Sequence, residues 1–186
     1  MNLANKLTMF RVVLIPFFVI FMLVPVFQVW WGSLIALIIF IVASLTDMLD
    51  GKIARKYNLV TNFGKFMDPL ADKLLVCSAL ICFVALGRLD AWVVIVIIAR
   101  EFIISGFRLI ASDAGVVIAA SMWGKVKTCF QMGLVILIIL FTPVIPGVAV
   151  SNVIYIILDI LSYITAAITV ISLIDYIVKN KNVMRG

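Results

Sequence analysis

The sequence predicts an all-α polytopic membrane protein with six transmembrane helices. Of its 186 residues, 66% are hydrophobic and only 13% are charged, and the mean hydropathy is +1.29. A soluble domain carries about 25% charged residues, so a larger buried core cannot explain the shortage of charge. Six apolar stretches each approach the roughly 20 residues that cross a hydrocarbon core. They are too long and too uniformly apolar for barrel strands. We expect one membrane domain over residues 1–186.

Polar or Pro/Gly-containing breaks separate the six spans. The opening MNLANKLTM is too short to cross a membrane and mixes leucines with polar residues, which predicts a short interfacial helix. The first span has no small-residue cleavage site and more spans follow it, so it is not a removed signal peptide. The fifth loop is rich in proline, around Pro143 and Pro146. We expect the spans at about 11–27, 31–50, 68–87, 91–112, 124–142 and 152–178.

The positions of lysine and arginine predict the orientation. Thirteen of the fifteen lie at the N-terminus, between spans two and three, around the connection of spans four and five, or in the tail. With six spans these regions share one side, which the positive-inside rule makes cytoplasmic. Both termini are then cytoplasmic in a multi-pass protein of the cell membrane. The net charge of +6 indicates contact with anionic lipid headgroups. No aromatic residues alternate with the cations as in a nucleic-acid platform, so we expect no nucleic acid.

The composition also restricts the chemistry. The chain has no histidine, which excludes histidine-based triads and histidine-ligated zinc. The three cysteines, Cys77, Cys82 and Cys129, show no CxxC spacing and lie in apolar runs, so we interpret them as packing residues. Carboxylates, amines and hydroxyls must therefore carry any reaction.

Four of the nine acidic residues are concentrated where span two ends and span three begins. Asp47 and Asp50 are three residues apart, and Asp68 and Asp72 are four apart. On a helix each spacing places both carboxylates on one face, about 5–6 Å apart at Cβ. Span two runs toward the cytoplasm and span three runs back, so the pairs can face each other. The sequence therefore predicts a four-carboxylate cluster near the membrane interface.

Such a cluster requires cations, because desolvated like charges are strongly unfavourable. Carboxylate oxygens without nearby histidine or cysteine favour Mg²⁺, Mn²⁺ or Ca²⁺, and two divalent ions would balance four carboxylates. Paired metals are typical of phosphoryl or phosphodiester displacement. The alternative is that these are solvated helix-end charges paired with nearby basic residues, namely Lys52, Arg55, Lys65 and Lys73. Four aspartates at two helical spacings favour the metal site.

The residues around the aspartates favour a nucleotide diphosphate as ligand. Gly51 and Gly64 lack side chains, so a bulky ligand can approach the backbone there. Ala54 keeps the same face shallow. Arg55 offers a fork of donors to a diphosphate, and Thr61 adds a hydroxyl.

This stretch resembles the DxxDGxxAR(x8)GxxxDxxxD signature of the CDP-alcohol phosphotransferase family. The resemblance implies a membrane enzyme in which the hydroxyl of one alcohol displaces CMP from a CDP-alcohol. It implies that the four aspartates hold the divalent ions, Mg²⁺ or Mn²⁺, and that Asp72 also deprotonates the acceptor. It further implies a cytoplasm-facing cavity, a homodimer, and contacts to the CDP moiety from Gly51, Ala54, Arg55, Thr61 and Gly64.

Outside the signature, the chain resembles the bacterial phosphatidylglycerophosphate synthases of that family. NLANKLTMFRVVLIPFF is similar to their NxxNxLTxxRxxLIP start, with Ala4 where proline is expected, and AREFIISGFR and GKVKT are similar as well. The resemblance extends to about Thr128. It implies CDP-diacylglycerol and sn-glycerol 3-phosphate as substrates, with phosphatidylglycerophosphate and CMP as products. It also places Asn5 and Thr8 beside the nucleotide.

Four further cations are candidates for binding the acceptor phosphate. Arg100 and Arg108 are eight residues apart and share a helical face, which points inward if Arg100 is to avoid lipid. Lys125 and Lys127 stand at the start of the fifth span. The alternative pairs the arginines with Glu101 or Asp113 and gives the lysines to lipid headgroups.

Two other functions stay open at this point. Another member of the family would use a different acceptor, as in enzymes of the cardiolipin, phosphatidylserine or phosphatidylinositol phosphate synthase type. A cation-coupled transporter would also place carboxylates in membrane spans, but usually near the midplane and in two similar halves. The cluster predicted here lies at one edge of the membrane and no repeat is visible, which favours the enzyme.

Overall fold

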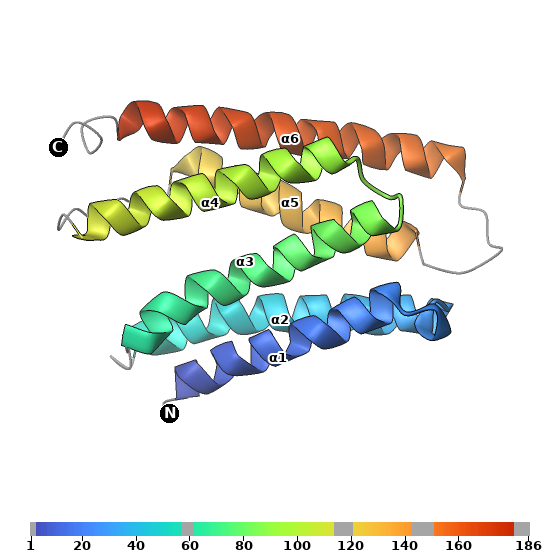
Figure 1. Ribbon diagram of the computed structural model, residues 1–186, viewed down its shortest axis with the longest axis horizontal. Coiled ribbons are helices and arrows are strands. Elements are labelled where there is room, and N and C mark those ends of the chain that lie inside the picture. Colours follow the sequence, from blue (N-terminus) through green and yellow to red (C-terminus); the bar gives the residue numbers. More distant parts are fainter. Residues whose placement is uncertain (1–2, 57–61, 114–120, 143–150, 181–186) are drawn as a thin grey trace. The chain divides into compact units, whose positions relative to one another are not determined.

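The computed structural model describes the backbone of residues 3–56, 62–113, 121–142 and 151–180. Side chains are described for these residues except 3–5, 47–56, 62–66, 68–69, 72 and 112–113. The described backbone is helical and contains no strand, which confirms the all-α polytopic membrane fold (Figure 1). The elements are α1 (Leu3–Leu23), the short 3₁₀ helix η1 (Pro25–Phe27), α2 (Trp30–Lys56), α3 (Asn62–Ala85), α4 (Ala91–Asp113), α5 (Met122–Phe141) and α6 (Asn152–Lys179).

The first three helices extend beyond their apolar stretches. α2 continues six residues past the predicted span, and α3 begins six residues before it. α1 begins at Leu3, so the predicted interfacial helix is not a separate element but the first turns of α1. The opening segment has no proline or glycine to interrupt helical hydrogen bonding, so the helix continues directly into the span.

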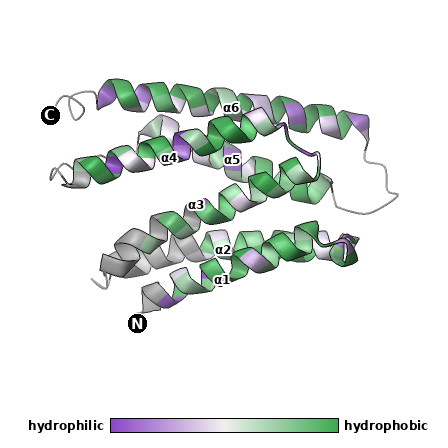
Figure 2. Cartoon of the chain, viewed as in Figure 1, coloured by the Kyte–Doolittle hydropathy of each residue, from purple (hydrophilic) through white to green (hydrophobic). Residues whose placement is uncertain are grey.

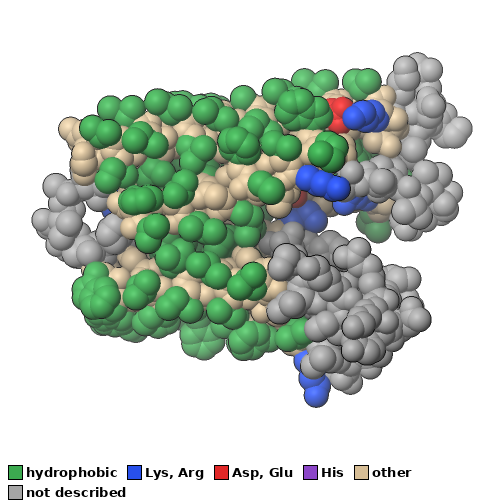
Figure 3. All heavy atoms as spheres, turned by 180° about the vertical axis from the view of Figure 1, so that it is seen from behind, with side chains coloured by type: hydrophobic (Ala, Val, Ile, Leu, Met, Phe, Trp, Pro, Cys, Tyr) green, Lys and Arg blue, Asp and Glu red, His purple; other side chains and the backbone are tan. Residues whose placement is uncertain are grey.

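The apolar character varies along the helices. α1 over Lys6–Leu23, α5 and α6 are long and apolar enough to cross a membrane, whereas Trp30–Thr46 of α2 and Lys73–Ala85 of α3 are shorter apolar segments. Hydrophobic residues dominate the helices in Figure 2. On the face shown in Figure 3, apolar side chains cover most of the described surface and few charged side chains are visible. An apolar exterior of this kind suits contact with lipid.

The chain forms two compact units, of which unit 1 comprises residues 1–88 and 135–150. In unit 1, α1 packs against α2 and α3, and α2 also contacts α3. Phe18 of α1 and Phe40 of α2 are fully buried, with ring centroids 6.0 Å apart. The start of α1, the end of α2 and the start of α3 lie at the same end of this unit (Figure 1). The signature residues therefore belong to one end of a three-helix group.

A Schellman-type turn ends α3. Gly87 has a φ of 65°, which glycine adopts without strain. The Arg88 amide donates to the Phe83 carbonyl at 2.8 Å, and the Gly87 amide donates to the Val84 carbonyl at 3.0 Å. These bonds satisfy carbonyls that the helix end would leave unpaired. The third span therefore ends where the sequence places its glycine.

Gly32 is a site of close backbone approach between η1 and α2. A Cβ atom at residue 32 would overlap the carbonyl oxygen of Phe27. We expect Gly32→Ala to lower the free energy of unfolding by about 3 kcal/mol, because the backbone must shift to accept the methyl group. The unfolding midpoint in detergent micelles measures this. Gly133→Ala is the control, since its added Cβ meets nothing within 4 Å. Equal effects of the two substitutions would contradict the steric argument.

Unit 2 comprises residues 89–134 and 151–186, so α5 contributes its first part to unit 2 and its last part to unit 1. In unit 2, α4 packs against α6. Near the start of α4, Tyr163 Oη of α6 donates to Asp90 Oδ2 at 2.9 Å, and the Tyr163 ring stacks on Trp92 with centroids 5.5 Å apart. The buried face of α6 consists largely of small, hydroxyl-bearing and aromatic residues: Leu158, Ser162, Thr165, Ala166, Thr169, Ser172 and Tyr176.

Candidate functional site

The four signature aspartates lie on two continuous helices of unit 1. α2 is continuous through Asp47 and Asp50 to Lys56, and α3 is continuous through Asp68 and Asp72. Separations of three and four residues on unbroken helices place each pair on one helical face. The aspartate side chains lie outside the described residues, as do those of Asn5, Gly51, Ala54, Arg55 and Gly64, while Thr61 lies outside the described backbone too.

A buried polar face on α1 belongs to the same unit. Thr8 and Arg11 are three residues apart and both have 0% of their surface exposed. The same face continues into Phe18 and Met22, which are also buried. Thr8 is a predicted CDP contact and is buried on the helix that packs against α2 and α3.

Arg11 belongs to the opening motif and to the cations that predict the orientation, and it is fully buried in unit 1. Buried arginines in membrane helices require polar partners. The acidic residues that the sequence of unit 1 offers to such a cation are the four signature aspartates. The spacing of Thr8, Arg11, Phe18 and Met22 along one helical face is the signal that identifies this buried position.

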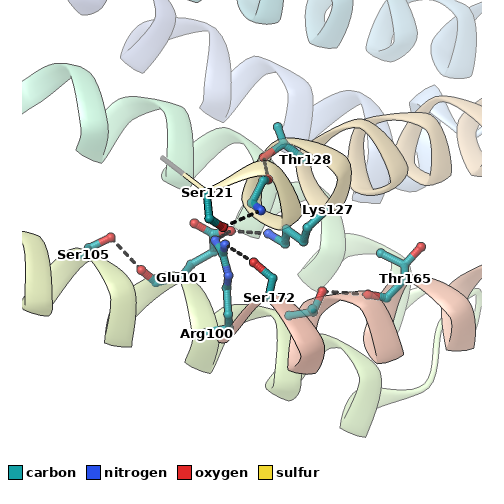
Figure 4. A network of polar contacts seen from close by, with 10 residues as sticks. Arg100, Glu101, Ser105, Ser121, Lys127, Thr128, Thr165 and Ser172 are labelled. Atoms are coloured by element: carbon teal, nitrogen blue, oxygen red, sulfur yellow. Dashed lines mark hydrogen bonds and ion pairs between the residues drawn. The ribbon is translucent and has the colours of Figure 1, made fainter. Parts of the chain in front are cut away.

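In unit 2 a charged network joins three helices (Figure 4). Arg100 Nη1 of α4 donates to Glu101 Oε1 at 3.2 Å, and Lys127 Nζ of α5 donates to the same oxygen. Arg100 Nη2 donates to Ser172 Oγ of α6 at 2.7 Å. Arg100 is 8% exposed and Lys127 is 1% exposed. The network is therefore a buried pair of cations that share one carboxylate oxygen.

The start of α5 is shaped to admit the Arg100 guanidinium. Ser121 Oγ accepts a hydrogen bond from the Gly124 amide at 3.1 Å, which satisfies a donor of the first helical turn. A Cβ atom on Gly124 would lie 3.4 Å from Arg100 Nη2 and 3.6 Å from Ser121 Oγ. Glycine at this position thus leaves room for the guanidinium against the helix.

The four predicted acceptor cations fall into two groups. Arg100 and Lys127 are brought together in the network, whereas Arg108 and Lys125 are exposed. The pairing of Arg100 with Glu101, considered as an alternative from sequence, is present at 3.2 Å. The assignment of Lys127 to lipid headgroups is wrong, because its side chain is buried and donates to Glu101.

Sequence reasoning gave no role to Ser172. α6 reads as a generic apolar span, but Ser162, Thr165, Thr169 and Ser172 recur every three or four residues on one face, and all four are buried. Such a hydroxyl stripe on an apolar helix indicates its packed face. The stripe does not indicate which of these hydroxyls forms a hydrogen bond with a charged side chain of another helix.

Comparisons with known proteins identify the family of the chain. The family model of CDP-alcohol phosphatidyltransferase matches residues 1–174. A CDP-diacylglycerol--glycerol-3-phosphate 3-phosphatidyltransferase of Bacillus subtilis is 52% identical over 143 residues, which cover 70% of this chain and 72% of the relative. A protein of the same name from Rickettsia bellii is 37% identical, and the match covers 94% of this chain and 93% of the relative. Another from Haemophilus influenzae is 43% identical, and the match covers 70% of this chain and 71% of the relative. The chain belongs to the CDP-alcohol phosphatidyltransferase family.

Proposed function

We propose that the chain transfers the phosphatidyl group of CDP-diacylglycerol to sn-glycerol 3-phosphate. The products are CMP and phosphatidylglycerophosphate, so the enzyme acts in phospholipid biosynthesis. The observation that carries this proposal is the similarity to relatives whose name states both substrates, at 52% identity and, at lower identity, over 94% of the chain. The enzyme works in the cell membrane as a homodimer, the state that the family resemblance implies.

The reaction exchanges one phosphate ester bond for another. The acceptor hydroxyl oxygen attacks the phosphorus that carries diacylglycerol, and the bond from this phosphorus to the CMP oxygen breaks. Asp72 takes the hydroxyl proton, the role that the family resemblance implies for the last aspartate of the signature. Arg55 and the small residues beside it, Gly51, Ala54 and Gly64, bind the CDP moiety together with Asn5, Thr8 and Thr61.

The donor set of unit 1 fits two Mg²⁺ or Mn²⁺ ions. Asp47, Asp50, Asp68 and Asp72 supply hard oxygen ligands, and their total charge of four would be balanced by two divalent cations. When bound, such ions neutralise charge on the diphosphate and on the departing CMP. The two continuous helices of unit 1, each carrying one aspartate pair, support this assignment.

The acceptor phosphate is the ligand that suits the cations of unit 2. Arg100 and Lys127 bind it, and the exposed Arg108 and Lys125 attract it from solution. In the described network Arg100 and Lys127 both donate to one oxygen of Glu101, so the two cations stand close together. An apolar surrounding strengthens the attraction between these cations and a phosphate.

The proposed orientation places the active site and both termini in the cytoplasm. Single cysteines are placed at positions 58, 147 and 181 in a cysteine-free background, and an impermeant thiol reagent is added to intact cells. Positions 58 and 181 should be protected, because they lie on the side of the membrane that carries most of the cations. Position 147 should react. Permeabilised cells are the control, in which all three positions should be labelled. External labelling at position 58 would reverse the orientation.

An acceptor panel tests the proposed reaction directly. Purified protein in detergent micelles is supplied with CDP-diacylglycerol and Mg²⁺, and CMP release is followed with sn-glycerol 3-phosphate, serine, inositol phosphate or phosphatidylglycerol as acceptor. We expect CMP release with sn-glycerol 3-phosphate at a kcat/KM well above that measured with the other acceptors. Preferential use of serine, or of any uncharged acceptor, would refute the proposed acceptor and leave the family unchanged.

A further inference from the structure

The cations of unit 2 are held by partners on three helices. Arg100 lies on α4 and uses its two terminal nitrogens separately, one toward Glu101 and the other toward Ser172 of α6. Lys127 of α5 donates to the Glu101 oxygen that Arg100 also uses (Figure 4). The Arg100–Glu101 contact lies within α4, but the contacts to Lys127 and Ser172 join different helices and form only in the folded unit.

These contacts determine where the guanidinium and ammonium groups stand. Long basic side chains have many rotamers, and a guanidinium held at two nitrogens has a fixed plane. Two donors within hydrogen-bond distance of one oxygen lie at most about 6 Å from each other, a separation that one phosphate group can bridge. Gly124 leaves space for Arg100 Nη2 next to α5. The network therefore presents both cations in one place before any ligand arrives.

Glu101 and Ser172 contribute in different ways. Glu101 supplies charge as well as an acceptor oxygen, and without it both buried cations would lose the carboxylate that they share. Ser172 is neutral, so its contact with Arg100 affects the position of the guanidinium and leaves the charge of the cluster unchanged. The serine is fully buried, and its hydroxyl accepts directly from a charged group.

We propose that Glu101 and Ser172 are positioning residues that hold Arg100 and Lys127 as a preformed site for the acceptor phosphate. This inference rests on the proposed function and extends it to α6. The last helix then contributes to acceptor affinity through a single hydroxyl. The residues act through the two cations and need no contact with the substrate.

Ser172→Ala tests the inference with a matched control. Ser162→Ala removes another buried hydroxyl from the same face of α6, but Ser162 Oγ donates to the Asp159 carbonyl of its own helix at 2.8 Å. We expect Ser172→Ala to raise the KM for sn-glycerol 3-phosphate about tenfold, as a lost hydrogen bond to a charged group does. The KM for CDP-diacylglycerol should change by less than about twofold, and Ser162→Ala should change neither.

Glu101 is tested by two substitutions. Glu101→Gln keeps an oxygen that can accept from both cations, whereas Glu101→Ala removes it, so the alanine variant should show the larger rise in the KM for sn-glycerol 3-phosphate. If Glu101→Ala does not fold, Ser172→Ala decides, because it leaves the charges of the network unchanged.

The outcomes separate the two proposals. Equal changes in both KM values, or the same change in Ser172→Ala and Ser162→Ala, overturn the positioning inference while the wild-type reaction stands. If the wild type uses a different phosphorylated acceptor, the proposed function is wrong and the same comparison with that acceptor decides the inference. An uncharged acceptor overturns both.

Discussion

Asp68→Asn is expected to lower kcat/KM for both substrates by about a thousandfold. The substitution keeps the volume of the side chain but removes one anionic oxygen ligand, and a bound metal supplies several kcal/mol of charge stabilisation at about 1.36 kcal/mol per tenfold in rate. Asp47→Asn and Asp50→Asn should behave alike, and excess Mg²⁺ or Mn²⁺ should restore part of the activity, because the remaining ligands bind the ions more weakly. The measurement is CMP release in detergent micelles over a range of metal concentrations.

Asp159→Asn is the matched control for this experiment. Asp159 is an exposed aspartate on α6 of unit 2, so its loss should leave activity and metal dependence unchanged. Chelation of divalent cations should abolish activity in the wild type, and added Mg²⁺ should recover it. Full activity of Asp68→Asn, or a wild type that works in the presence of chelator, would refute the metal site.

The sequence was sufficient for the helices because span length and apolar composition leave few alternatives in a membrane. α4, α5 and α6 begin and end within about two residues of the expected positions, a margin typical of helix boundaries. The first span ends at Leu23, four residues before its expected end, because Pro25 begins the separate helix η1. The other differences lie at the start of α1, the end of α2 and the start of α3, where polar residues continue a helix that hydropathy alone ends early. The extensions of α2 and α3 carry Gly51, Ala54, Arg55 and Gly64, whereas the four aspartates lie within the expected spans.

The two proposed sites differ in how much the sequence reveals. The aspartate spacing is local to each helix, so reading three- and four-residue intervals was enough to predict the cluster. The network of Arg100, Glu101, Lys127 and Ser172 joins residues up to 72 positions apart, and only the packing of α4 with its neighbours brings them together. The sequence identified both cations but could not show that they share Glu101, or that Arg108 and Lys125 are exposed.

Lys127→Met should lower kcat/KM for sn-glycerol 3-phosphate by about a hundredfold, which is a larger effect than that of the same change at Lys125. Both lysines begin α5 and are two residues apart, but Lys127 is 1% exposed and donates to Glu101, whereas Lys125 is exposed. Methionine keeps most of the length and the apolar character of the side chain and removes the charged ammonium group. The measurement is the initial rate against acceptor concentration at saturating CDP-diacylglycerol.

Lys125→Met is the matched control, because it removes the same charge from the same turn of α5 at a solvent-accessible position. A surface charge is screened by salt, so its loss should lower kcat/KM less than about threefold and the difference should disappear at high ionic strength. The effect of Lys127→Met should persist in salt, since a buried charge is screened much less. If both variants lose activity equally, or if the loss in Lys127→Met disappears with salt, the acceptor phosphate binds at the exposed cations and the buried pair has a structural role. The two lysines thus distinguish a preformed phosphate site inside unit 2 from attraction of the acceptor at its surface.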